Sequence, residues 1–537
     1  MAHVSGSQRE RGAHRGRRTP ATLLGWLREV THAQGSRPAV GDGTETWSYD
    51  RLWDAAGRVA QGLRRDGAAA APAVALIGTN SPAYLAAYLG VMRSGSMVVP
   101  LNHRNSLADL RQQLELVGAD LCVAAGADDG LLAGLGEACS VLDAGRLLET
   151  EPVVDIPEPD ADDPALCVLT SGSTGAPKGV VHSQGTLLHA GLQLLGALPI
   201  NRDDVGLAFL PFFASAPEHA LPLLLGGAAL RTTVGFDPDE ICDACDEVTS
   251  FDAVPTAIGR LLELGNHAQL RKLKWISFAS EPMPATLLER WREEVPTVAA
   301  HQFYGLTELL PATHADPVMM REASGTVGTP YPTTALRIVD EELDEVGIGE
   351  EGEVVCWSPA RMSGYLDAPA QTAEALTDDG ALRTGDIGHL DERGRLFLTG
   401  RRKELIISGG LNVSPAEIEA AAYRCPGVAA AAVIGMPDSR WGETPVLIAV
   451  ASRGESLSAT DLLRHCEGEL AGYKRPSAAA VLPDLPVIGI GKSAKAVLRE
   501  RIMRGELTLV HRNGMGDAAG QDPEGAVNEP GTTPRRS

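Results

Sequence analysis

Lysine is scarce in this 537-residue chain, which has 47 Lys and Arg residues but only seven lysines. Because there are also 70 Asp and Glu residues, the formal net charge is −23. Such a surplus repels the phosphates of a nucleic acid, so we expect no nucleic-acid partner. It does not exclude a small anionic ligand, which a local cluster of donors can hold. Arginine supplies nearly all of the positive charge, so each lysine is a candidate for a specific role.

Long apolar runs are lacking as well. No run approaches the ~18 residues of a membrane-spanning helix, so we expect no membrane span. Arg17 and Arg18 precede a short apolar stretch at 21–27, but Arg28 follows it at once and no small-residue cleavage site is present. We interpret this stretch as the first helix of the fold rather than as an export signal.

Cysteine is sparse, with eight residues scattered along the chain. Such a scatter does not form the disulfide framework of a small secreted protein. Cys242 and Cys245 make a lone CxxC motif, without a second pair or nearby histidines to complete a metal site. The cysteines therefore fit a protein of the reducing cytoplasm.

The length of the chain exceeds the ~250–300 residues at which a single core stops growing, so at least two domains are expected. Residues 1–20 are rich in Arg, Gly and Ser, and residues 511–537 are rich in Gly, Pro and acidic residues. Both ends lack large apolar side chains and are predicted to be disordered.

Between these ends, short apolar strands alternate with amphipathic helices. Ser48 can cap a helix whose apolar residues share one face, namely Leu52, Ala55, Ala56, Val59 and Leu63. A strand at 73–77, a helix at 82–93 and a strand at 97–101 follow. This βαβ order predicts an α/β fold with layered, largely parallel sheets and helices on both faces.

The pattern changes after about residue 325. Short strands separated by glycine, at 352–357 and 395–398, predict a more antiparallel, β-barrel-like section. A final compact unit combines helices at 416–423 and 461–470 with a strand at 429–434. We expect it to be a small α+β domain.

A Gly-rich loop at 169–180, Leu-Thr-Ser-Gly-Ser-Thr-Gly-Ala-Pro-Lys-Gly-Val, is the strongest local motif. Its glycines allow a tight turn whose N–H groups face an anion, while hydroxyls and Lys178 add donors and charge. It is not a Walker A loop, because Pro177 precedes the lysine and Gly179 follows it. A Ser/Gly-rich surface turn is the alternative to a polyphosphate site. The expected phosphate-binding residues are Thr170, Ser171, Gly172, Ser173, Thr174, Gly175 and Lys178.

This loop resembles the phosphate-binding signature of the adenylate-forming (AMP-binding) superfamily, which includes acyl-CoA synthetases, peptide-synthetase adenylation domains and firefly luciferase. Its other signatures follow in order: Tyr304-Gly305-Leu306-Thr307-Glu308, Arg383-Thr384-Gly385-Asp386, Gly400-Arg401-Arg402-Lys403-Glu404, the run from Ser408 to Glu419, and Gly491-Lys492. The resemblance covers about residues 21–505. It implies a large adenylation domain at 21–401 and a small mobile C-terminal domain at 402–510.

In this superfamily the motifs bind ATP and Mg²⁺. Glu308 offers the hard oxygen ligand that Mg²⁺ prefers, and the resemblance places Thr307 at the α-phosphate. Asp386 can accept hydrogen bonds from adjacent ribose hydroxyls, with Arg401 as a second ribose contact. The residues expected around the adenine are Ser280, Glu281, Pro282, Tyr304 and Gly305.

The resemblance also assigns roles in the small domain. Lys492 matches the catalytic lysine, which can bridge the substrate carboxylate and the α-phosphate as charge shifts between them. The family usually has Thr near position 488, where this chain has Ile488. Lys403 matches the hinge about which the small domain turns after adenylation. Gly409 and Gly410 would then leave room for a thin pantetheine arm.

The acyl pocket is expected at 209–215 and on the segments beside the adenine. Many acyl- and aryl-CoA ligases carry His where this chain has Ala214. Amino-acid-activating relatives place Asp near Phe213, so a free α-amino acid would lack a partner for its ammonium. We predict a mostly apolar pocket for a medium-chain or an aromatic acid. Its predicted residues are Phe212, Phe213, Ala214, His219, Ala279 and Leu310.

The sequence thus predicts an ATP-dependent ligase that forms an acyl-AMP and transfers the acyl group to a thiol, with CoA favoured. Alternatives are a carrier-protein phosphopantetheine arm, a nitrogen acceptor, or adenylation of an oxyanion other than a carboxylate. A catalytically silent nucleotide-binding protein would be expected to have lost Lys492, Glu308 or the Thr-Gly-Asp triplet, and all are present. Lys272, Lys274 and Lys495 are predicted to be solvated surface residues.

Overall fold

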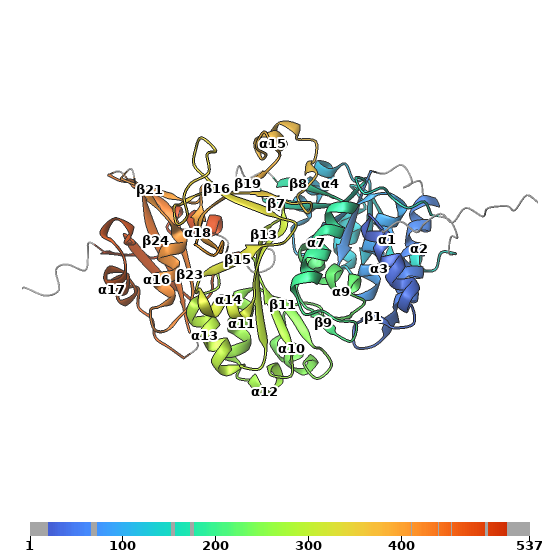
Figure 1. Ribbon diagram of the computed structural model, residues 1–537, viewed down its shortest axis with the longest axis horizontal. Helices are drawn as coiled ribbons and strands as arrows, with labels where there is room; N and C mark the ends of the chain where they lie inside the picture. Colours follow the sequence, from blue (N-terminus) through green and yellow to red (C-terminus); the bar gives the residue numbers. More distant parts are fainter. Residues whose placement is uncertain are drawn as a thin grey trace, which may run out of the picture.

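The structure is a computed structural model that describes residues 20–65, 72–151, 156–171, 177–409, 411–438, 440–452, 454–488, 492–493 and 495–512. At Ser171, Val487, Ile488, Lys492 and Ser493 it describes the backbone only. The ends predicted to be disordered lie almost entirely outside these ranges. Figure 1 shows the C-terminal domain on one side of the layered sheets of the large domain.

A seven-stranded sheet within the described residues forms one layer of the large domain, in the order β18-β8-β7-β4-β3-β5-β6. Its strands are β3 (Ala73–Gly78), β4 (Met97–Leu101), β5 (Leu121–Ala125), β6 (Ser140–Asp143), β7 (Pro164–Ser171), β8 (Pro177–Ser183) and β18 (Gly364–Tyr365). The central strands pair in parallel, as the βαβ order predicts, whereas β7 and β8 form an antiparallel hairpin. The Gly-rich loop connects the two strands of this hairpin.

Helices pack beside this sheet (Figure 1). The predicted first helix is α1 (Leu23–Gln34), and α2 (Tyr49–Arg65) buries all five apolar residues predicted to share one face. Ser48 caps α2, accepting a hydrogen bond from the Arg51 N–H at 3.2 Å. The neighbouring helices are α3 (Pro82–Ser94), α4 (Leu107–Val117), α5 (Asp129–Leu135), α6 (Ala144–Leu148), α7 (Gln184–Ala197), α8 (Phe212–Ser215) and α9 (Leu221–Leu225).

The larger sheet has thirteen strands in the described ranges, in the order β16-β17-β19-β20-β15-β14-β13-β12-β11-β9-β10-β1-β2. The strands are β1 (Pro38–Gly41), β2 (Thr46–Ser48), β9 (Val205–Ala208), β10 (Ala229–Thr232), β11 (Ser250–Ala253), β12 (Trp275–Phe278), β13 (Ala299–Leu306), β14 (Leu310–Ala315), β15 (Thr326–Pro330), β16 (Ala335–Val339), β17 (Gly352–Trp357), β19 (Leu382–Leu390) and β20 (Leu396–Arg401). In this spatial order, the neighbouring strands from β1 across to β13 pair in parallel. Those from β13 across to β16 pair antiparallel. The predicted strand at 352–357 coincides with β17.

The helices that accompany the larger sheet pack their apolar faces on its parallel half, around the buried Trp291 and Phe251. They are α10 (Pro238–Ala244), α11 (Pro255–Glu263), α12 (His267–Leu270), α13 (Ala285–Glu294) and α14 (Pro317–Glu322), and α15 (Pro369–Glu374) follows β18. This packing leaves the carboxyl ends of the parallel strands for the site described below.

The small domain has its own six-stranded sheet in the described residues. The predicted boundary at 401/402 falls between β20 and the first strand of this sheet. Its strands are β21 (Ile406–Ser408), β22 (Leu411–Val413), β23 (Val428–Asp438), β24 (Gly442–Ala451), β25 (Ala478–Leu482) and β28 (Val510–His511), and its helices are α16 (Pro415–Tyr423), α17 (Ala459–Glu469) and α18 (Lys495–Met503). Two helices and one strand predicted here correspond to α16, α17 and β23.

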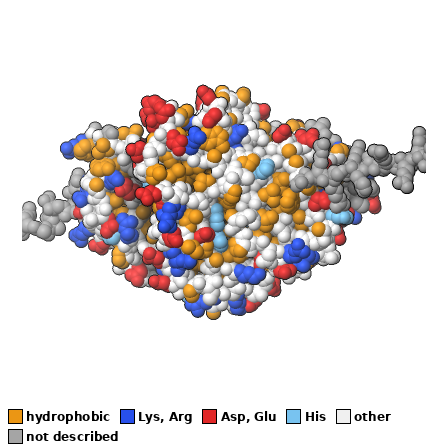
Figure 2. Space-filling model, in the orientation of Figure 1, with side chains coloured by type: hydrophobic (Ala, Val, Ile, Leu, Met, Phe, Trp, Pro, Cys, Tyr) orange, Lys and Arg blue, Asp and Glu red, His pale blue; other side chains and the backbone are white. Residues whose placement is uncertain are grey.

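The surface carries charges of both signs. Figure 2 shows acidic and basic side chains interspersed over one face. Within the described ranges, no helix is long and apolar enough to cross a membrane.

All eight cysteines are free, buried thiols, and burial raises the pKa of Cys245 in the CxxC motif to about 12.

Candidate active site

A cavity lies at the carboxyl ends of β9, β11, β12 and β13, which run parallel to one another. In open α/β sheets, ligands bind in the crevice at these strand ends. The lining residues are Leu210, Ser215, Glu218, Asp252, Ala253, Val254, Ala279, Ser280, Phe303, Gly305 and Leu310. The topology therefore places the predicted Ala279 and Leu310 in one pocket with residues that the sequence did not mark.

Gly305 and Leu310 shape one wall of this cavity. A Cβ atom at Gly305 would lie 1.9 Å from the Leu310 carbonyl oxygen, so no larger residue fits there. Leu310 and Ser280 have φ angles of 56° and 75°, in the left-handed region that such residues rarely adopt. Strained backbone of this kind clusters at ligand sites.

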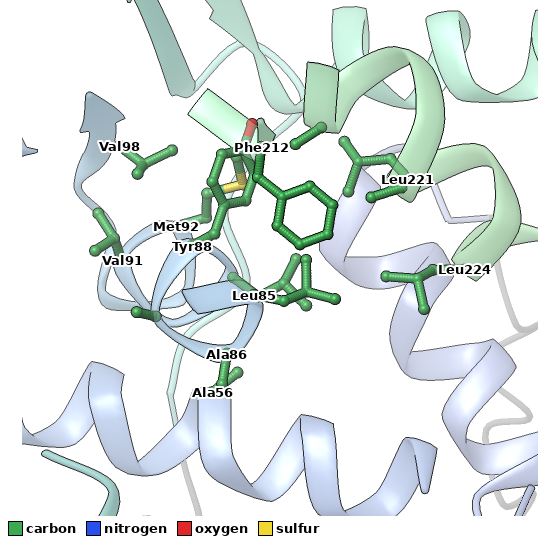
Figure 3. Close-up of a cluster of buried hydrophobic side chains, with 14 of the residues drawn as sticks. Ala56, Leu85, Ala86, Tyr88, Val91, Met92, Val98, Phe212, Leu221 and Leu224 are labelled. Carbon is green, nitrogen blue, oxygen red and sulfur yellow. The ribbon is translucent and has the colours of Figure 1, made fainter. Parts of the chain in front are cut away.

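Phe212 does not reach the cavity. It is 1% exposed and packs among the side chains of α3 and α9, with its ring centroid 6.0 Å from that of Tyr84. Figure 3 shows it between Leu85 and Leu221. The prediction that Phe212 shapes the acyl pocket is therefore corrected, because it is a residue of the hydrophobic core.

Phe213, Ala214 and His219 also lie outside the cavity lining. The His219 ring donates to the Leu207 carbonyl oxygen at 3.0 Å, and burial lowers its pKa to about 4. It is thus a neutral, structural histidine. The π-helical turn η2 (Ala216–Ala220) follows α8 here, and its wider turn changes which positions face the cavity. Ordinary helical periodicity does not reveal such a turn.

Two carboxyl groups, those of Glu218 and Asp252, line the cavity. They correct the prediction of a mostly apolar pocket. Asp252 is 6% exposed and accepts a hydrogen bond from the Ser277 hydroxyl at 3.0 Å. Burial, with a further contribution from the charge of Glu218, raises the pKa of Asp252. The two residues lie on different elements, so no local motif connects them.

The predicted ribose residues form one hydrogen-bonded group. Asp386 is 3% exposed, and its two oxygens accept from the Tyr304 hydroxyl at 2.6 Å and from Arg401 Nε at 2.9 Å. Asp386 and Arg401 are directly opposite each other on β19 and β20. A carboxylate can accept about four hydrogen bonds, so Asp386 retains capacity for ribose hydroxyls. Burial, and then the charge of Asp386, raise the pKa of Tyr304, which remains a donor.

Glu353, which the sequence did not mark, holds the loop that precedes Asp386. It is 5% exposed and accepts from Arg383 Nη2 at 2.6 Å, from Arg383 Nε at 3.2 Å and from the Gly385 N–H at 3.3 Å. Gly385 has a φ of 71°, which favours glycine. The Arg-Thr-Gly-Asp motif is thus held in place by a charge-assisted network.

The segment expected beside the adenine borders the same cavity. Ser280 lines the cavity, and Glu281 accepts a hydrogen bond from the Thr256 hydroxyl at 3.0 Å. Pro282 is exposed at the following turn. The segment therefore runs from the cavity wall to the surface.

Tyr365 joins the predicted magnesium ligand to the predicted phosphate lysine. Its hydroxyl donates to Glu308 Oε1 at 2.9 Å, and Lys178 Nζ lies 4.8 Å from the centre of its ring. The second contact is a cation–π interaction. Burial, and then the charge of Glu308, raise the pKa of Tyr365. The sequence did not mark Tyr365, because it is distant from both partners along the chain.

His182 holds the backbone of the predicted α-phosphate residue. Its ring Nε2 donates to the Thr307 carbonyl oxygen at 2.7 Å, and its Nδ1 lies 3.4 Å from the Thr186 hydroxyl. His182 is fully buried, which lowers its pKa to about 4 and keeps the ring neutral. The sequence did not mark this histidine either.

The Gly-rich loop is described at its two ends. Thr170 and Lys178 are directly opposite each other in the β7–β8 hairpin, so the ends of the loop meet. The predicted Gly172, Ser173, Thr174 and Gly175 lie outside the described residues, as does the side chain of Ser171. Lys178, on this hairpin, and Glu308 both contact Tyr365, so the hairpin places Lys178 near Glu308.

In the small domain, Lys492 begins β27 (Lys492–Ser493), opposite Ile488 of β26 (Val487–Ile488), and its side chain is not described. Lys403 is exposed in the turn between β20 and β21. Gly409 has a φ of 62°, and a Cβ there would lie 2.8 Å from the Trp441 ring. Gly410 lies outside the described residues.

One surface prediction needs correction. Lys495 is 30% exposed, and its ammonium lies 2.8 Å from Glu419 and 3.4 Å from Glu404, next to the predicted hinge. Lys274 is exposed as predicted, and it pairs with the buried Asp204 at 2.6 Å. Lys272 pairs with Asp246 at the surface.

Comparisons with known proteins agree with this architecture. Residues 27–366 match the AMP-binding enzyme family, and residues 417–492 match the AMP-binding enzyme C-terminal domain. Since the first match spans more than half of the chain, the chain belongs to the AMP-binding enzyme family, the adenylate-forming superfamily.

Relatives and solved structures extend the comparison. A feruloyl-CoA synthase from Amycolatopsis sp is 34% identical, covering 86% of this chain and 95% of that protein. A fatty acid–[acyl-carrier-protein] ligase, ScoC, from Streptomyces coeruleorubidus is 31% identical, covering 88% of this chain and 95% of that protein. The structure of o-succinylbenzoate coenzyme A synthetase (MenE) from Bacillus subtilis, in complex with ATP and magnesium ion, has a TM-score of 0.79 at 27% identity, covering 88% of this chain and 98% of that one.

Proposed function

We propose that this chain is an AMP-forming acid–thiol ligase. In the first step a carboxylate attacks the α-phosphorus of ATP, giving acyl-AMP and pyrophosphate. In the second, a thiol attacks the acyl carbon, giving a thioester and AMP. The observation that carries the proposal is the juxtaposition on β13. Tyr304 contacts Asp386 at the nucleotide side, while the adjacent Phe303 and Gly305 line the cavity for the acid.

Different residues around the nucleotide would hold the ribose, hold the phosphates and neutralise charge in the first step. Asp386 and Arg401 would hold the ribose, while Thr170 and Lys178 would hold the β- and γ-phosphates. His182 fixes the backbone of Thr307 and thus the place of the α-phosphate contact. We assign to Lys492 the neutralisation of the charge that develops between the carboxylate and the α-phosphate.

Glu308 fits a magnesium ligand. It is a half-buried carboxylate that accepts a hydrogen bond from the neutral Tyr365 hydroxyl on Oε1, and it retains oxygen lone pairs for a hard cation. In the described residues, no group of three His, Cys, Asp or Glu side chains could hold a metal ion unaided. The nucleotide phosphates would therefore supply further ligands, and Mg²⁺ would offset phosphate charge.

CoA is the proposed acceptor. The feruloyl-CoA synthase and the coenzyme A synthetase support this choice, whereas ScoC favours a carrier-protein phosphopantetheine arm as the second candidate. Both acceptors present the same thiol. After a rotation about Lys403, Gly409 and Gly410 would face it, and the lack of side chains on both glycines would leave room for the thin pantetheine arm.

The test is ATP–pyrophosphate exchange with the full chain across aromatic and medium-chain acids, followed by CoA, a phosphopantetheinylated carrier protein or hydroxylamine in turn. We expect acid-dependent exchange, and thioester formation with CoA. Exchange followed by transfer to the carrier protein alone would move the acceptor to the second candidate. The absence of exchange with every acid would refute the proposed adenylation.

A further inference from the structure

Lys495 joins separate segments of the small domain. Its ammonium lies 2.8 Å from Glu419 on α16 and 3.4 Å from Glu404. Glu404 directly follows Lys403, the predicted hinge residue. Glu419 is largely buried, and it also accepts a hydrogen bond from the Val433 N–H at 2.8 Å, which holds it against β23. Lys495 is therefore tied both to the hinge turn and to the core of the small domain.

The position of Lys495 is unfavourable for a cation without such partners. It is the first residue of α18, where the positive end of the helix macrodipole opposes a positive side chain. Burial alone would lower the pKa of Lys495, but the charges of Glu419 and Glu404 outweigh burial and raise the pKa. The ammonium therefore stays charged, and the two carboxylates hold it at a helix end that opposes its charge.

The hinge turn in its own right contacts the proposed nucleotide site. The N–H groups of Glu404 and Leu405 donate to the Arg401 carbonyl oxygen at 3.0 Å and 3.1 Å. The side chain of Arg401 donates from Nε to Asp386 at 2.9 Å. A continuous series of contacts therefore runs from the proposed ribose residues through the hinge turn to Lys495.

Lys492 lies close to this anchor along the chain. It precedes Lys495 by three residues, and its backbone pairs with Ile488 between β26 and β27. Three residues span at most about 11 Å, so an anchored Lys495 restricts where the backbone of Lys492 can lie. The contacts of Lys495 thus limit the distance between the Lys492 backbone and the hinge turn.

We propose that Lys495 is a positioning residue for adenylation, which together with Glu404 and Glu419 holds the Lys492 segment in a fixed place relative to the hinge. The inference rests on the proposed function, because it concerns the step in which Lys492 neutralises developing charge. Misplacing a catalytic group by about 1 Å can lower a rate by about a hundredfold, so a small displacement of Lys492 is costly. Thioester formation from acyl-AMP does not use this charge and should not depend on Lys495.

Lys495→Met removes the ammonium and keeps an unbranched side chain. We expect the kcat for acid-dependent pyrophosphate exchange by the full chain to fall by about tenfold or more, with the KM for Mg·ATP changed by less than about threefold. Thioester formation from acyl-AMP supplied directly should fall by less than about twofold. Lys495→Arg retains a cation for both carboxylates and should recover most of the exchange rate.

Two comparisons separate positioning from a general structural role. Arg424→Met removes a different ion pair of the small domain, with Glu469, and should leave both activities unchanged. In the Lys492→Ala variant, adding Lys495→Met should not lower exchange further, because a positioning residue acts only through Lys492. A further fall in the double variant would show that Lys495 acts by itself and would overturn the inference.

Glu404→Gln keeps the test valid if Lys495→Met does not fold, because Glu404 is exposed. We expect it to lower the kcat for exchange by about threefold or more, again with thioester formation retained. Equal losses in both half-reactions, or unchanged exchange in both variants, would overturn the inference and leave the ligase activity standing. If the unsubstituted chain catalyses exchange with no acid, the proposed function fails and the inference fails with it.

Discussion

The hydroxyl of Tyr365 donates to Glu308 Oε1 across 2.9 Å, while the same ring lies against the ammonium of Lys178. One aromatic side chain therefore holds both the proposed magnesium ligand and the proposed phosphate lysine. The two contacts use different parts of Tyr365, its hydroxyl and its π face, so substitution can separate them.

Tyr365→Phe removes the hydroxyl and retains the ring. We expect the KM for Mg·ATP to rise by about threefold to tenfold, because Glu308 loses one hydrogen bond that orients it. Initial rates of pyrophosphate exchange at varied Mg·ATP measure this change. The control is Tyr331→Phe, whose buried hydroxyl has no partner among the described residues. Equal effects of the two substitutions would argue against an orienting role for Tyr365.

Lys492→Ala should reduce acyl-AMP formation by about a hundredfold or more, because the developing charge loses its cation. The measurement is exchange with a reactive acid, alongside thioester formation from acyl-AMP supplied directly. Lys272→Ala, which removes a surface lysine paired with Asp246, should retain both activities. If adenylation survived and only thioester formation fell, the proposed role of Lys492 would be wrong.

Glu353→Gln should lower the free energy of unfolding of the large domain by about 2 kcal/mol, because a buried acceptor loses its charge opposite Arg383. Urea unfolding followed by tryptophan fluorescence measures this loss, and the KM for ATP should rise with it. Glu345→Gln removes an exposed partner of Arg337 and should change stability little. A stable variant with an unchanged KM would show that Glu353 does not hold the Asp386 loop.

Stability should fall on acidification, and His182 is one of the buried histidines that contribute to the loss. Its pKa is about 4 in the native state, below the ordinary value of 6.5, so the unfolded state takes up the proton first. The loss begins as the pH falls below about 6.5 and reaches about 2 kcal/mol near pH 5. His182→Asn should reduce the slope of the unfolding free energy against pH between 7 and 5, while the buried His219 and His301 maintain the rest of the dependence. The exposed His32→Asn should leave it unchanged, and an unaltered slope in both variants would contradict the assignment.

The sequence predicted those parts of the molecule in which one local pattern controls one element. The strand at 352–357 and the one-sided helix after Ser48 appear as predicted, and Asp386 lies directly opposite Arg401, the other predicted ribose ligand. Partners from other elements were missed, including Tyr365 and Glu353. A hydrogen bond between distant positions leaves no mark in the local pattern.

The acid pocket was predicted least well, for a physical reason. In the run Phe212-Phe213 either ring could face a ligand, and tertiary packing against Tyr84 places Phe212 in the core. A π-helical turn follows this run. That turn breaks the 3.6-residue period on which facing positions are inferred. The same turn carries Glu218 to the cavity, and parallel pairing of β11 with β12 brings Asp252 beside Ser277.

Strand β13 carries residues of both proposed substrate sites. Successive side chains of a strand point to opposite faces, so Phe303 lines the cavity while Tyr304 reaches Asp386. The offset between the proposed acid site and the proposed nucleotide site is therefore set within one strand, independently of how the small domain is oriented. A bisubstrate inhibitor that joins an acyl mimic to an adenosine mimic should consequently bind best with a short, rigid linker, and a flexible spacer should weaken it even though both ends still fit.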